Sequence, residues 1–480
     1  MALTVAVFLP LVAALLCWVK PLRNIAWGVT VVCLSISFAL AVVSAHQVLV
    51  NGRSIGIPGW FEADGLGALM ILLVSFVCDL AAIFAGGYMH HSERSDRLWW
   101  FYCNYNLLVF ALIVVPALTD PNLVWVGVEL ITLFAILLVG FENTPNALEA
   151  AWKYAILTLM GAPISLLGFL MLYWAYRSAG GTGSETWQGL HAMAPLMSPN
   201  LLKLSFLLVF VGFGSKTGFV PTHTWLPDAH SQAPTPICAV LSGVKTSVPL
   251  YAVLRFLSII LASPEAKLGE WMVVLGLCSV AVAAFLLLQV RDYKRMFAYS
   301  TVEHMGIILT AAGFATQDGA LGAVAQMLNH SLTKSLCFYA AGIVLLSLGT
   351  RQIRDVRGLF RVSPFAAGAL LLCALAIAGA PPFPIFLSEF SILSAGLRSG
   401  HNAAVAILAT LIVVAFVGIM LQVNNMIFGK SDLYSSPEAI PASCRTAVII
   451  GAIPILLLGV FIPQPVHSLL VLAAQQLGGR

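Results

Sequence analysis

The chain has 480 residues, of which 60% are hydrophobic and only 9% are charged, with a formal net charge of +4. Soluble domains carry about 25% charged residues, so this composition indicates a surface that mostly meets lipid. The small net charge, and the lack of a basic patch interleaved with aromatic residues, argue against nucleic acid as a partner.

The nine cysteines are scattered, mostly inside apolar runs, and form no Cys-x-x-Cys pair. We therefore expect them to be small buried side chains, with no metal and no cofactor bound by this chain.

Apolar runs long enough to cross a bilayer recur along the whole sequence, since a spanning helix needs about 20 such residues. The predicted fold is an all-α polytopic membrane protein with about 14 transmembrane helices. The predicted spans are residues 3–19, 25–48, 64–88, 101–118, 121–140, 151–175, 200–225, 235–262, 269–290, 297–316, 319–349, 364–395, 402–428 and 446–470.

Basic residues are distributed unevenly between the two sets of loops. Of the 24 Lys and Arg, fourteen follow odd-numbered spans and six follow even-numbered ones. Because positively charged loops stay in the cytoplasm, the odd-numbered loops are predicted inside and both termini outside. Arg255 is expected near the outer end of the eighth span, and three lysines fall within spans.

A charge at bilayer depth costs about 2.5–3.5 kcal/mol on insertion scales, so it must face a partner, water or the bundle interior. Charges spread over several helices indicate a path rather than a set of structural ion pairs. The candidate proton path consists of Glu129, Lys216, Lys245, His330, Lys334 and Glu389.

Glu129 lies near the middle of the fifth span, and Lys216 is its expected partner. Withdrawing a cation from a buried carboxylate makes the carboxylate take up a proton, so the pair suits a switch. Gly214, Gly218 and Pro221 surround Lys216 and predict a helix break. Broken helices place polar groups at the midplane in transporters.

The twelfth span repeats this pattern. Pro381, Pro382 and Pro384 predict a second break, and Glu389 follows it. One broken helix in each half indicates a duplication, inverted because each unit has an odd number of helices. The predicted segments are residues 1–100, 101–262 and 269–428 (the two repeats of five helices), and 429–480.

His330 and Lys334 are four residues apart and share a helix face. Imidazole titrates nearest to neutrality, which suits a relay, and Lys245 is expected to bridge Lys216 and His330. The spacing of the histidines after the first break matches no dedicated metal site, so polar scaffolding on the uptake side is favoured. Accessory roles are expected for Asp79, His223, Asp228, His230, Glu303 and His304.

The sequence shows no nucleotide-binding loop, nucleophile elbow or haem-ligand pattern. Energy must therefore come from a partner or from an existing ion gradient, and the chain is expected to be a non-catalytic subunit.

The stretch 212–236, GFGSKTGFVPTHTWLPDAHSQAPTP, resembles the signature of the antiporter-like subunits. These occur in respiratory complex I, in multisubunit cation/proton antiporters and in membrane-bound [NiFe] hydrogenases. The resemblance runs from about residue 123 to 428 and implies fourteen helices with the seventh and twelfth broken. It implies that Glu129, Lys216, His330, Lys334 and Glu389 match the family's buried residues in spans 5, 7, 11 and 12.

One position departs from the family pattern. The eighth-span lysine of the family commonly lies two residues later, where this chain has Ser247, while Lys245 stands earlier. Such a shift turns the side chain by about 200° on an ideal helix. Either the helix is locally distorted or the central relay differs.

Residues 302–306 (VEHMG) and 234–243 (PTPICAVLSG) are most similar to hydrogenase-4 component F. The resemblance implies a proton-translocating subunit of a group 4 [NiFe] hydrogenase or formate hydrogenlyase-like complex in a bacterial or archaeal cytoplasmic membrane. Its partners would be other membrane subunits and a soluble arm that holds the NiFe and iron–sulfur centres.

Three alternatives stay open. One is a subunit of complex I or of a cation/proton antiporter. Another is a scaffold that anchors a soluble arm and pumps nothing, and the third is a module for inorganic-carbon uptake. The choice between H⁺ and Na⁺, the direction and stoichiometry of transport and the electron donor also stay open.

Overall fold

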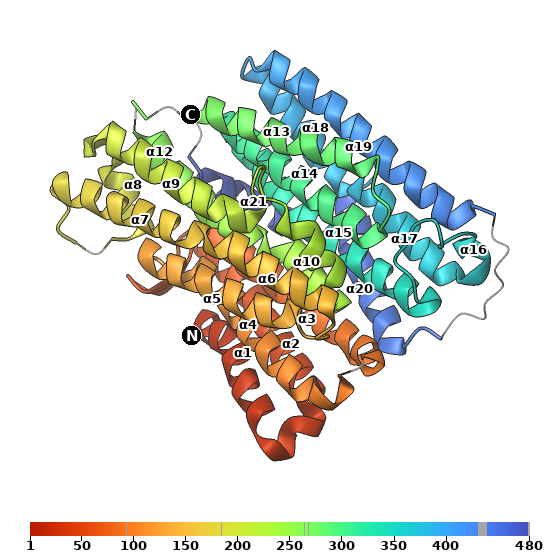
Figure 1. Cartoon of the computed structure of the whole chain (residues 1–480). Helices are drawn as coiled ribbons and strands as arrows, with labels where there is room; N and C mark the ends of the chain where they lie inside the picture. The colour runs from red at the N-terminus through yellow and green to blue at the C-terminus, as the bar shows by residue number, and fades with distance from the viewer. Residues whose placement is uncertain (93, 184, 264, 267, 431–438, 479–480) are drawn as a thin grey trace.

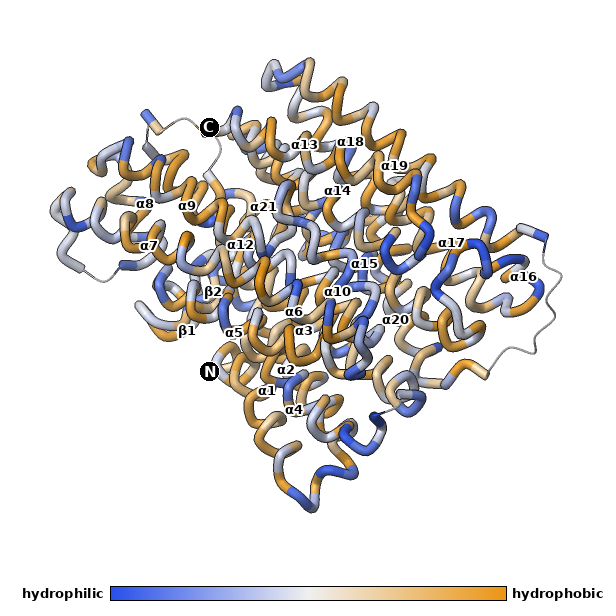
Figure 2. The backbone as a smooth tube through the Cα atoms, viewed as in Figure 1, coloured by the Kyte–Doolittle hydropathy of each residue, from blue (hydrophilic) through white to orange (hydrophobic). Residues whose placement is uncertain are grey.

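The computed structural model describes residues 1–480 except 93, 184, 264, 267, 431–438 and 479–480. Within the described residues, ten helices are long and apolar enough to cross a membrane, and Ala2–Trp18 and Pro364–Ile377 are shorter apolar helices. The helices run roughly side by side (Figure 1), and hydrophobic residues follow their length (Figure 2). The predicted all-α, multi-pass fold is confirmed.

Three apolar helices and a short hairpin form the N-terminal part, which matches the first three predicted spans. Its elements are α1 (Ala2–Trp18), η1 (Lys20–Ile25), α2 (Ala26–Asn51), β1 (Ile55–Ile57), β2 (Phe61–Ala63), α3 (Gly65–Tyr88), η2 (Met89–His91) and η3 (Ser95–Arg97). The two strands pair antiparallel in the loop between α2 and α3.

The first predicted repeat contains spans 4 to 8. Its elements are α4 (Leu98–Val114), η4 (Val115–Ala117), α5 (Pro121–Val139), α6 (Pro145–Leu159), α7 (Gly161–Ser178), α8 (Trp187–Met193), η5 (Ala194–Leu196), α9 (Pro199–Thr217), α10 (Trp225–Gln232), α11 (Thr235–Val240), a π-helical turn η6 (Leu241–Lys245) and α12 (Ser247–Ala262).

The second predicted repeat contains spans 9 to 13. Its elements are α13 (Gly269–Leu287), α14 (Tyr293–Gly313), α15 (Gln317–Leu348), α16 (Leu359–Val362), α17 (Pro364–Ile377), α18 (Pro384–Arg398) and α19 (Asn402–Phe428). Neighbouring helices pack alike in the two units: α4 contacts α5 as α13 contacts α14, α7 contacts α9 as α15 contacts α17, and α6 contacts α10 as α15 contacts α18. The repeat boundaries themselves stay a prediction.

The last predicted span is two helices rather than one. These are α20 (Ala442–Val460) and α21 (Gln464–Gln475). Pro463 and Pro465 explain the interruption, because proline lacks the N–H that would continue the helical ladder. Residues 431–438, which belong to the predicted segment 429–480, lie outside the described residues.

Short polar side chains fix where several helices begin. Asp64, Asp120, Thr144, Asp292 and Thr316 each accept a hydrogen bond from a backbone N–H in the first turn of α3, α5, α6, α14 and α15, respectively. Such caps satisfy N–H groups that have no partner within the helix.

The two predicted breaks are present. In span 7 the chain leaves α9 at Gly218 (φ +92°) and resumes at α10, so Pro221 lies in the break while Gly214 remains helical. In span 12 the chain leaves α17 through Gly379 (φ +74°), passes Pro381 and Pro382 and enters α18 with Pro384 in its first turn. Left-handed backbone at both exits explains the glycines there.

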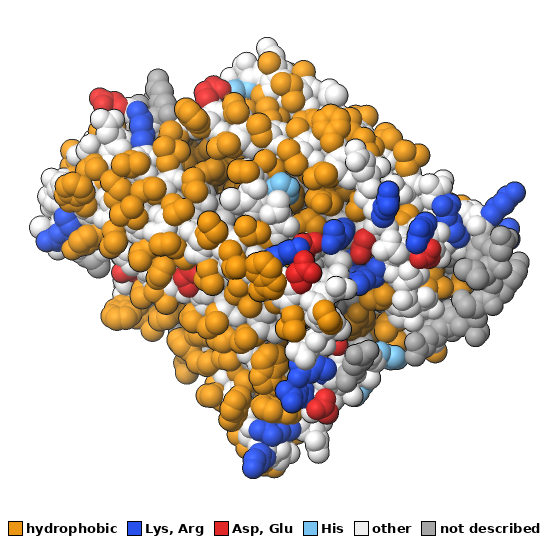
Figure 3. Space-filling view, viewed as in Figure 1, with side chains coloured by type: hydrophobic (Ala, Val, Ile, Leu, Met, Phe, Trp, Pro, Cys, Tyr) orange, Lys and Arg blue, Asp and Glu red, His pale blue; other side chains and the backbone are white. Residues whose placement is uncertain are grey.

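The centre of the bundle is formed by α3, α11–α12 and α15. The apolar window of residues 235–262 is 100% buried, against 33% for that of α19 at the edge. Figure 1 shows both termini at the end of the bundle that carries α8, and Figure 3 shows most Lys and Arg on the visible face toward the other end.

Candidate functional site

Lys216 and Glu129 form a buried ion pair between α9 and α5. The Lys216 side chain is fully buried, and its Nζ donates to Glu129 Oε2 at 3.0 Å and to Thr132 Oγ1 at 3.1 Å. The Glu129 side chain remains 19% exposed on the flank of α5, and its Oε1 is buried without a hydrogen-bond partner. One carboxylate oxygen is therefore free to accept a proton or another donor.

Lys245 lies beside this pair and forms no ion pair with a carboxylate among the residues that the structure describes. Its Nζ donates to the backbone oxygen of Lys216 at 2.9 Å and stands 4.0 Å and 4.8 Å from the ring centroids of Trp225 and Tyr154. Aromatic faces attract a cation through their quadrupole, more strongly when water is excluded. The site thus holds the ammonium group with one carbonyl and two rings.

The backbone around Lys245 is distorted, as the first of the two explanations of its shifted position requires. Residues Leu241–Lys245 form a π-helical turn, in which Thr246 N–H donates to Leu241 O at 3.3 Å. Turns of this kind accommodate one extra residue in a helix. The local distortion allows Lys245 to reach Lys216.

His330 on α15 continues the path across the bundle. Its Nε2 lies 3.4 Å from Ser242 O in the π turn, while Nδ1 is buried without a partner. The His330 ring centroid is 5.2 Å from that of His304 on α14. His330 Nε2 therefore faces the π turn, while the imidazole ring lies beside that of His304.

Lys334 stands one turn from His330 and is also fully buried. Its Nζ donates to Phe297 O and to Ser300 Oγ, both on α14. These two oxygens replace part of the hydration that burial removes. The i, i+4 pair on one face of α15 is present as the sequence predicted.

His304 connects α14 to the second break. Its Nδ1 accepts from Gln326 Nε2 at 2.8 Å, and its Nε2 donates to Ile377 O at 3.0 Å, where α17 ends. These partners assign the neutral tautomer with its proton on Nε2. Gln326 Oε1 in turn accepts from Ser388 Oγ, next to Glu389.

Glu389 lies in the first turns of α18 and is 5% exposed. Its carboxylate packs directly over Gly379, so that a Cβ there would overlap with Oε2. Glu303 on α14, one residue before His304, is buried too, with Oε2 unpartnered. Two carboxyl groups therefore lie at the far end of the path.

These residues form one connected set, which we call the buried polar line. It runs from α5 through the break in α9–α10, the π turn and the middle of α15 to the break in α17–α18. Its members are Glu129, Lys216, Lys245, His330, Lys334, His304, Glu303, Gln326 and Glu389.

The remaining accessory candidates lie off this line. Asp228 pairs with Lys153 at 3.3 Å and with Arg295 in a partly exposed cluster. Asp79 accepts from Ser35 Oγ at 3.0 and 3.1 Å, on the side of α2.

His230 is fully buried between the line and the basic end of the bundle. Its Nδ1 lies 2.7 Å from Leu226 O, and its Nε2 has no hydrogen-bond partner. His223 lies in the break itself, with Nδ1 unpartnered. Among the described residues, no group of three or more His, Cys, Asp or Glu is placed to hold a metal ion.

Two features were missed by the sequence reasoning. The first is a cavity of about 610 Å³ at the end of the bundle away from the termini, lined by Ser231, Gln232, Lys294 and Arg351 among others. Lys294, expected in a loop, is buried and donates to Ala233 O at 3.1 Å. The cavity begins one residue after His230 and gives water access to that region.

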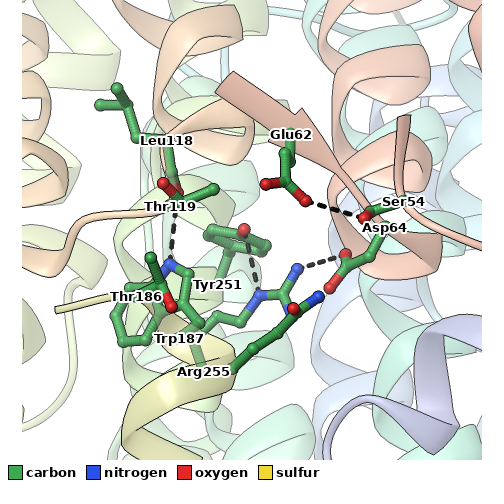
Figure 4. Close-up of a pocket in the computed structure, with 10 residues that line it drawn as sticks. Ser54, Glu62, Asp64, Leu118, Thr119, Thr186, Trp187, Tyr251 and Arg255 are labelled. Atoms are coloured by element: carbon green, nitrogen blue, oxygen red, sulfur yellow. Dashed lines mark hydrogen bonds and ion pairs between the residues drawn. The ribbon is translucent and has the colours of Figure 1, made fainter. Parts of the chain in front are cut away.

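The second missed feature is an ion pair between Asp64 and Arg255 at the end of the bundle that carries α8 (Figure 4). The Arg255 side chain is 7% exposed, and its Nε donates to the phenol oxygen (Oη) of Tyr251 at 3.1 Å. A buried arginine needs a carboxylate partner. The sequence feature that could have revealed this pair is Asp64, the aspartate that caps α3.

A helical membrane bundle with two broken helices and a buried polar line defines a class of ion-translocating membrane subunits. The sequence matches the family described as NADH:quinone oxidoreductase/Mrp antiporter, TM, over residues 119–415. Residues 51–98 match the family described as NADH-ubiquinone oxidoreductase (complex I), chain 5 N-terminus. The chain belongs to this antiporter-like membrane subunit family.

Relatives of the chain come from several kinds of complex. The hydrogenase-4 component F homolog of Methylacidiphilum infernorum is 36% identical over 79% of this chain and 82% of the relative. Hydrogenase-4 component B of Escherichia coli is 31% identical over 68% of this chain, which spans 49% of that longer protein. NADH-quinone oxidoreductase subunit N of Desulforudis audaxviator is 27% identical over 90% of both chains.

Solved structures show the same fold. A chain of the membrane-bound sulfane sulfur reductase, an archaeal respiratory membrane complex, superposes with a TM-score of 0.89 at 26% identity, covering 99% of this chain and 97% of that chain. A chain of the Mrp complex from Dietzia superposes with a TM-score of 0.83 at 19% identity, covering 99% and 97%. These neighbours are subunits of multisubunit membrane complexes.

Proposed function

We propose that this chain is a proton-translocating membrane subunit of a group 4 [NiFe] hydrogenase or formate hydrogenlyase-like complex. It lies in a bacterial or archaeal cytoplasmic membrane with both termini outside. One observation carries the transport role: buried titratable groups lie across the bundle from Glu129 to Glu389, with Lys216 bonded to Glu129, Lys245 bonded to the Lys216 carbonyl and His330 beside His304.

The chemistry of the line suits protons passed from group to group. Each lysine is held by neutral oxygens or by one carboxylate, so neither protonation state is locked by a full set of counterions. The breaks leave backbone carbonyls at Lys216 and Ile377 without helical partners and turn them toward the line. Transporters with broken helices place polar backbone groups near the midplane of the bilayer in this way.

Loading starts at the Glu129–Lys216 pair in this proposal. Electron transfer in a soluble arm changes the charge beside Glu129. This change moves Lys216 toward Glu129 or away from it. When the pair opens, Glu129 takes up a proton and Lys216 passes its own to the next group. Protons reach Glu389 through Lys245, His330 and Lys334.

The choice of complex rests on two resemblances. The hydrogenase-4 component F homolog is 36% identical over most of both chains, and the VEHMG motif brings Glu303 onto the line. The NiFe and iron–sulfur centres would belong to partner subunits. The alternatives are a complex I or Na⁺/H⁺ antiporter subunit, an inorganic-carbon uptake module, and a non-pumping scaffold.

The test of transport is Lys216→Met in the assembled complex. Removing a positioned proton carrier costs roughly two orders of magnitude in transfer rate, so substrate-driven proton pumping by everted vesicles should fall to background. Lys153→Met is the matched control, because Lys153 is a partly exposed lysine outside the line. A scaffold would retain full function in both variants, and that result would reject the proposal.

The test of the complex is mass spectrometry of the proteins that co-purify with the tagged chain. A [NiFe] large subunit and iron–sulfur proteins are the expected partners. NADH-oxidising or quinone-binding subunits would move the chain to complex I. Other antiporter subunits without a redox partner would mean that an ion gradient drives the work.

A further inference from the structure

The last span is interrupted inside the bundle rather than at its end. α20 ends at Val460 and α21 begins at Gln464, and residues 461–463, which we call the C-terminal break, are not helical. Near the end of α21, Leu472 packs against Gly65, the first residue of α3. Leu472 lies nine residues after the break, which corresponds to about 13 Å along a helix. The C-terminal break therefore lies about 13 Å below the level at which α3 begins.

A second contact places the C-terminal break at the depth of the buried polar line. Gly459, in the last turn of α20, packs on the break between α17 and α18, so that a Cβ there would overlap with Pro382 O and stand 3.0 Å from Phe383 Cα. Glu389 follows that break on α18. Two interruptions thus lie side by side at bilayer depth.

Several backbone groups at the C-terminal break have no partner in the helical ladder. Pro463 and Pro465 carry no N–H, so the carbonyl groups of Gly459 and Phe461, four residues earlier, lose the donors that a continuous helix would supply. Pro463 precedes α21 without a side-chain cap, so the first N–H groups of α21 are open as well. The break therefore presents both acceptors and donors.

These groups lie on an exposed flank of the bundle. Val460, Phe461 and Ile462 are 79%, 62% and 39% exposed, and the polar side chains of Gln464 and His467 are exposed beside them. Lipid offers no hydrogen bonds, so irregular backbone at bilayer depth is tolerated only against protein or in a water-filled cavity. Lipid alone does not satisfy this flank.

The helix α19 shows how a flank suited to lipid differs. The exposed large side chains along its middle are Ile407, Val413, Val417 and Leu421. Its helix is continuous from Asn402 to Phe428, so its ladder leaves no open backbone group over this length. The apolar surface of α19 is therefore compatible with lipid, and it supplies control positions for the C-terminal break.

A pocket beside the C-terminal break opens on the same flank. Its volume is about 130 Å³, and it lies between α15, α18, α20 and α21, with the exposed Ile462 and His467 in its lining. Asn329 forms part of its wall and is 7% exposed. Asn329 Nδ2 donates to Pro384 O at 2.8 Å and to Ser388 Oγ at 3.2 Å. Its Oδ1 accepts no hydrogen bond from the residues that the structure describes, so the pocket holds an open acceptor.

We propose that the C-terminal break and this pocket form a docking surface for a transmembrane helix of another membrane subunit. That helix lays an apolar face on Phe461 and Ile462 and inserts one uncharged hydrogen-bonding side chain, a hydroxyl or a carboxamide, toward Asn329. Interhelical hydrogen bonds and close packing are what hold helices together in membranes. The inference concerns assembly and does not depend on proton transport.

The chemistry of the surface selects this occupant. A hydroxyl or carboxamide both donates and accepts, which matches the open carbonyl and N–H groups of the break. A charged side chain is not matched, because the described lining of the pocket includes no Asp, Glu, Lys or Arg. A chain of the same fold occurs in a respiratory membrane complex, where helices of other subunits are at hand.

Photo-crosslinking in native membranes tests which molecule covers the break. The photoreactive residue benzoylphenylalanine replaces Phe461 or Ile462, and Val413 on α19 is the control because its 61% exposure matches that of Phe461. After irradiation, the complex is purified through a tag on this chain, and the adducts are identified by mass spectrometry. Both positions at the break should crosslink to a membrane-spanning peptide of one co-purifying subunit, whereas position 413 should not reach that subunit.

Filling the pocket tests whether the contact holds the subunit in place. Ser391 lines the pocket, so Ser391→Trp should exclude the inserted side chain, while Ser391→Ala leaves the space open. Loss of a central contact commonly weakens an interface by about tenfold or more, so recovery of the crosslinked subunit per tagged chain should fall by about that factor in Ser391→Trp. Ser391→Ala and Val413→Trp should recover it like wild type.

Lipid adducts alone at both positions of the break in the assembled complex would overturn the proposal, and so would adducts to a second copy of this chain. Undiminished recovery of the subunit with Ser391→Trp would overturn it too. If Ser391→Trp lowers the amount of the chain itself, the crosslinks decide. The result is separate from the transport test: a crosslinked subunit beside an unaffected Lys216→Met variant retains the docking surface and rejects transport.

Discussion

Glu185 illustrates how burial sets the protonation of a single carboxyl group in this protein. It lies in the loop before α8, is 7% exposed, and accepts from Asn122 Nδ2 at 3.0 Å. Burial raises the pKa of Glu185 to about 7, the Asn122 contact opposes the rise, and the Asp120 charge adds to it. The folded chain therefore prefers the protonated form over a range in which an unfolded chain is ionised.

Glu185→Gln should stabilise the protein in a pH-dependent way. The wild-type carboxyl contributes its full stability below the unfolded pKa and loses it as the pH rises through about 7. The Gln variant should match wild type near pH 4.5 and gain about 2 kcal/mol above pH 8. Thermal unfolding midpoints of the purified protein across this range measure the gain. Glu270→Gln, at an exposed glutamate, should change nothing, and a gain independent of pH would contradict the argument.

Individual contacts were only partly predictable from the sequence. Lys216 was expected as the partner of Glu129 because it is an opposite charge within a span, and a lone buried charge is too costly. The same rule applied to Arg255 did not find Asp64, since that residue stands just outside a span and also serves as a helix cap. Lys294 was missed because a basic residue near a loop looks solvated until the packing around it is known.

At the scale of elements, glycine and proline determine where the two broken helices are interrupted. Gly218 and Gly379 adopt left-handed backbone, and prolines follow each of them. Both breaks were therefore readable from composition. The π turn was not, because Leu241–Lys245 contains no residue that demands it, and only the shifted position of Lys245 pointed to a distortion.

Gly379→Ala should impair transport through geometry rather than charge. Alanine at φ +74° costs about 1 kcal/mol, and its methyl group would displace the Glu389 carboxylate from its place near Gln326. Coupled proton pumping should fall by about tenfold or more, because small misplacements of reacting groups slow a transfer by this much. Gly368→Ala on α17 has nothing within 4 Å of the added atom and should pump like wild type. Equal activity of the two variants would show that the position of Glu389 is not critical.

At the scale of the molecule, hydropathy predicted which segments cross the membrane but not where each one packs. The bilayer fixes segment length, and its lack of water forces the backbone into helices. The windows of α3 and α19 have similar mean hydropathy, 2.5 and 2.9, yet 83% of one and 33% of the other are buried. Lipid and protein interior are equally apolar, so hydropathy cannot distinguish them.

Orientation in the membrane is testable with two single cysteines in a background where the exposed Cys278 is replaced by serine. Gln188 and Ser95 are both exposed, at opposite ends of the bundle. A membrane-impermeant maleimide should label Gln188→Cys in intact cells and Ser95→Cys only in everted vesicles, because basic loops stay inside. The reverse pattern would place both termini in the cytoplasm.

The buried polar line contains three lysines, Lys216, Lys245 and Lys334, and three glutamates, Glu129, Glu303 and Glu389. With its histidines neutral, it can be electrically balanced as a whole. A second surplus charge in such a medium would face strong repulsion from the first. If protons move along this line as proposed, the line therefore carries one surplus proton at a time, and each proton must leave before the next one enters.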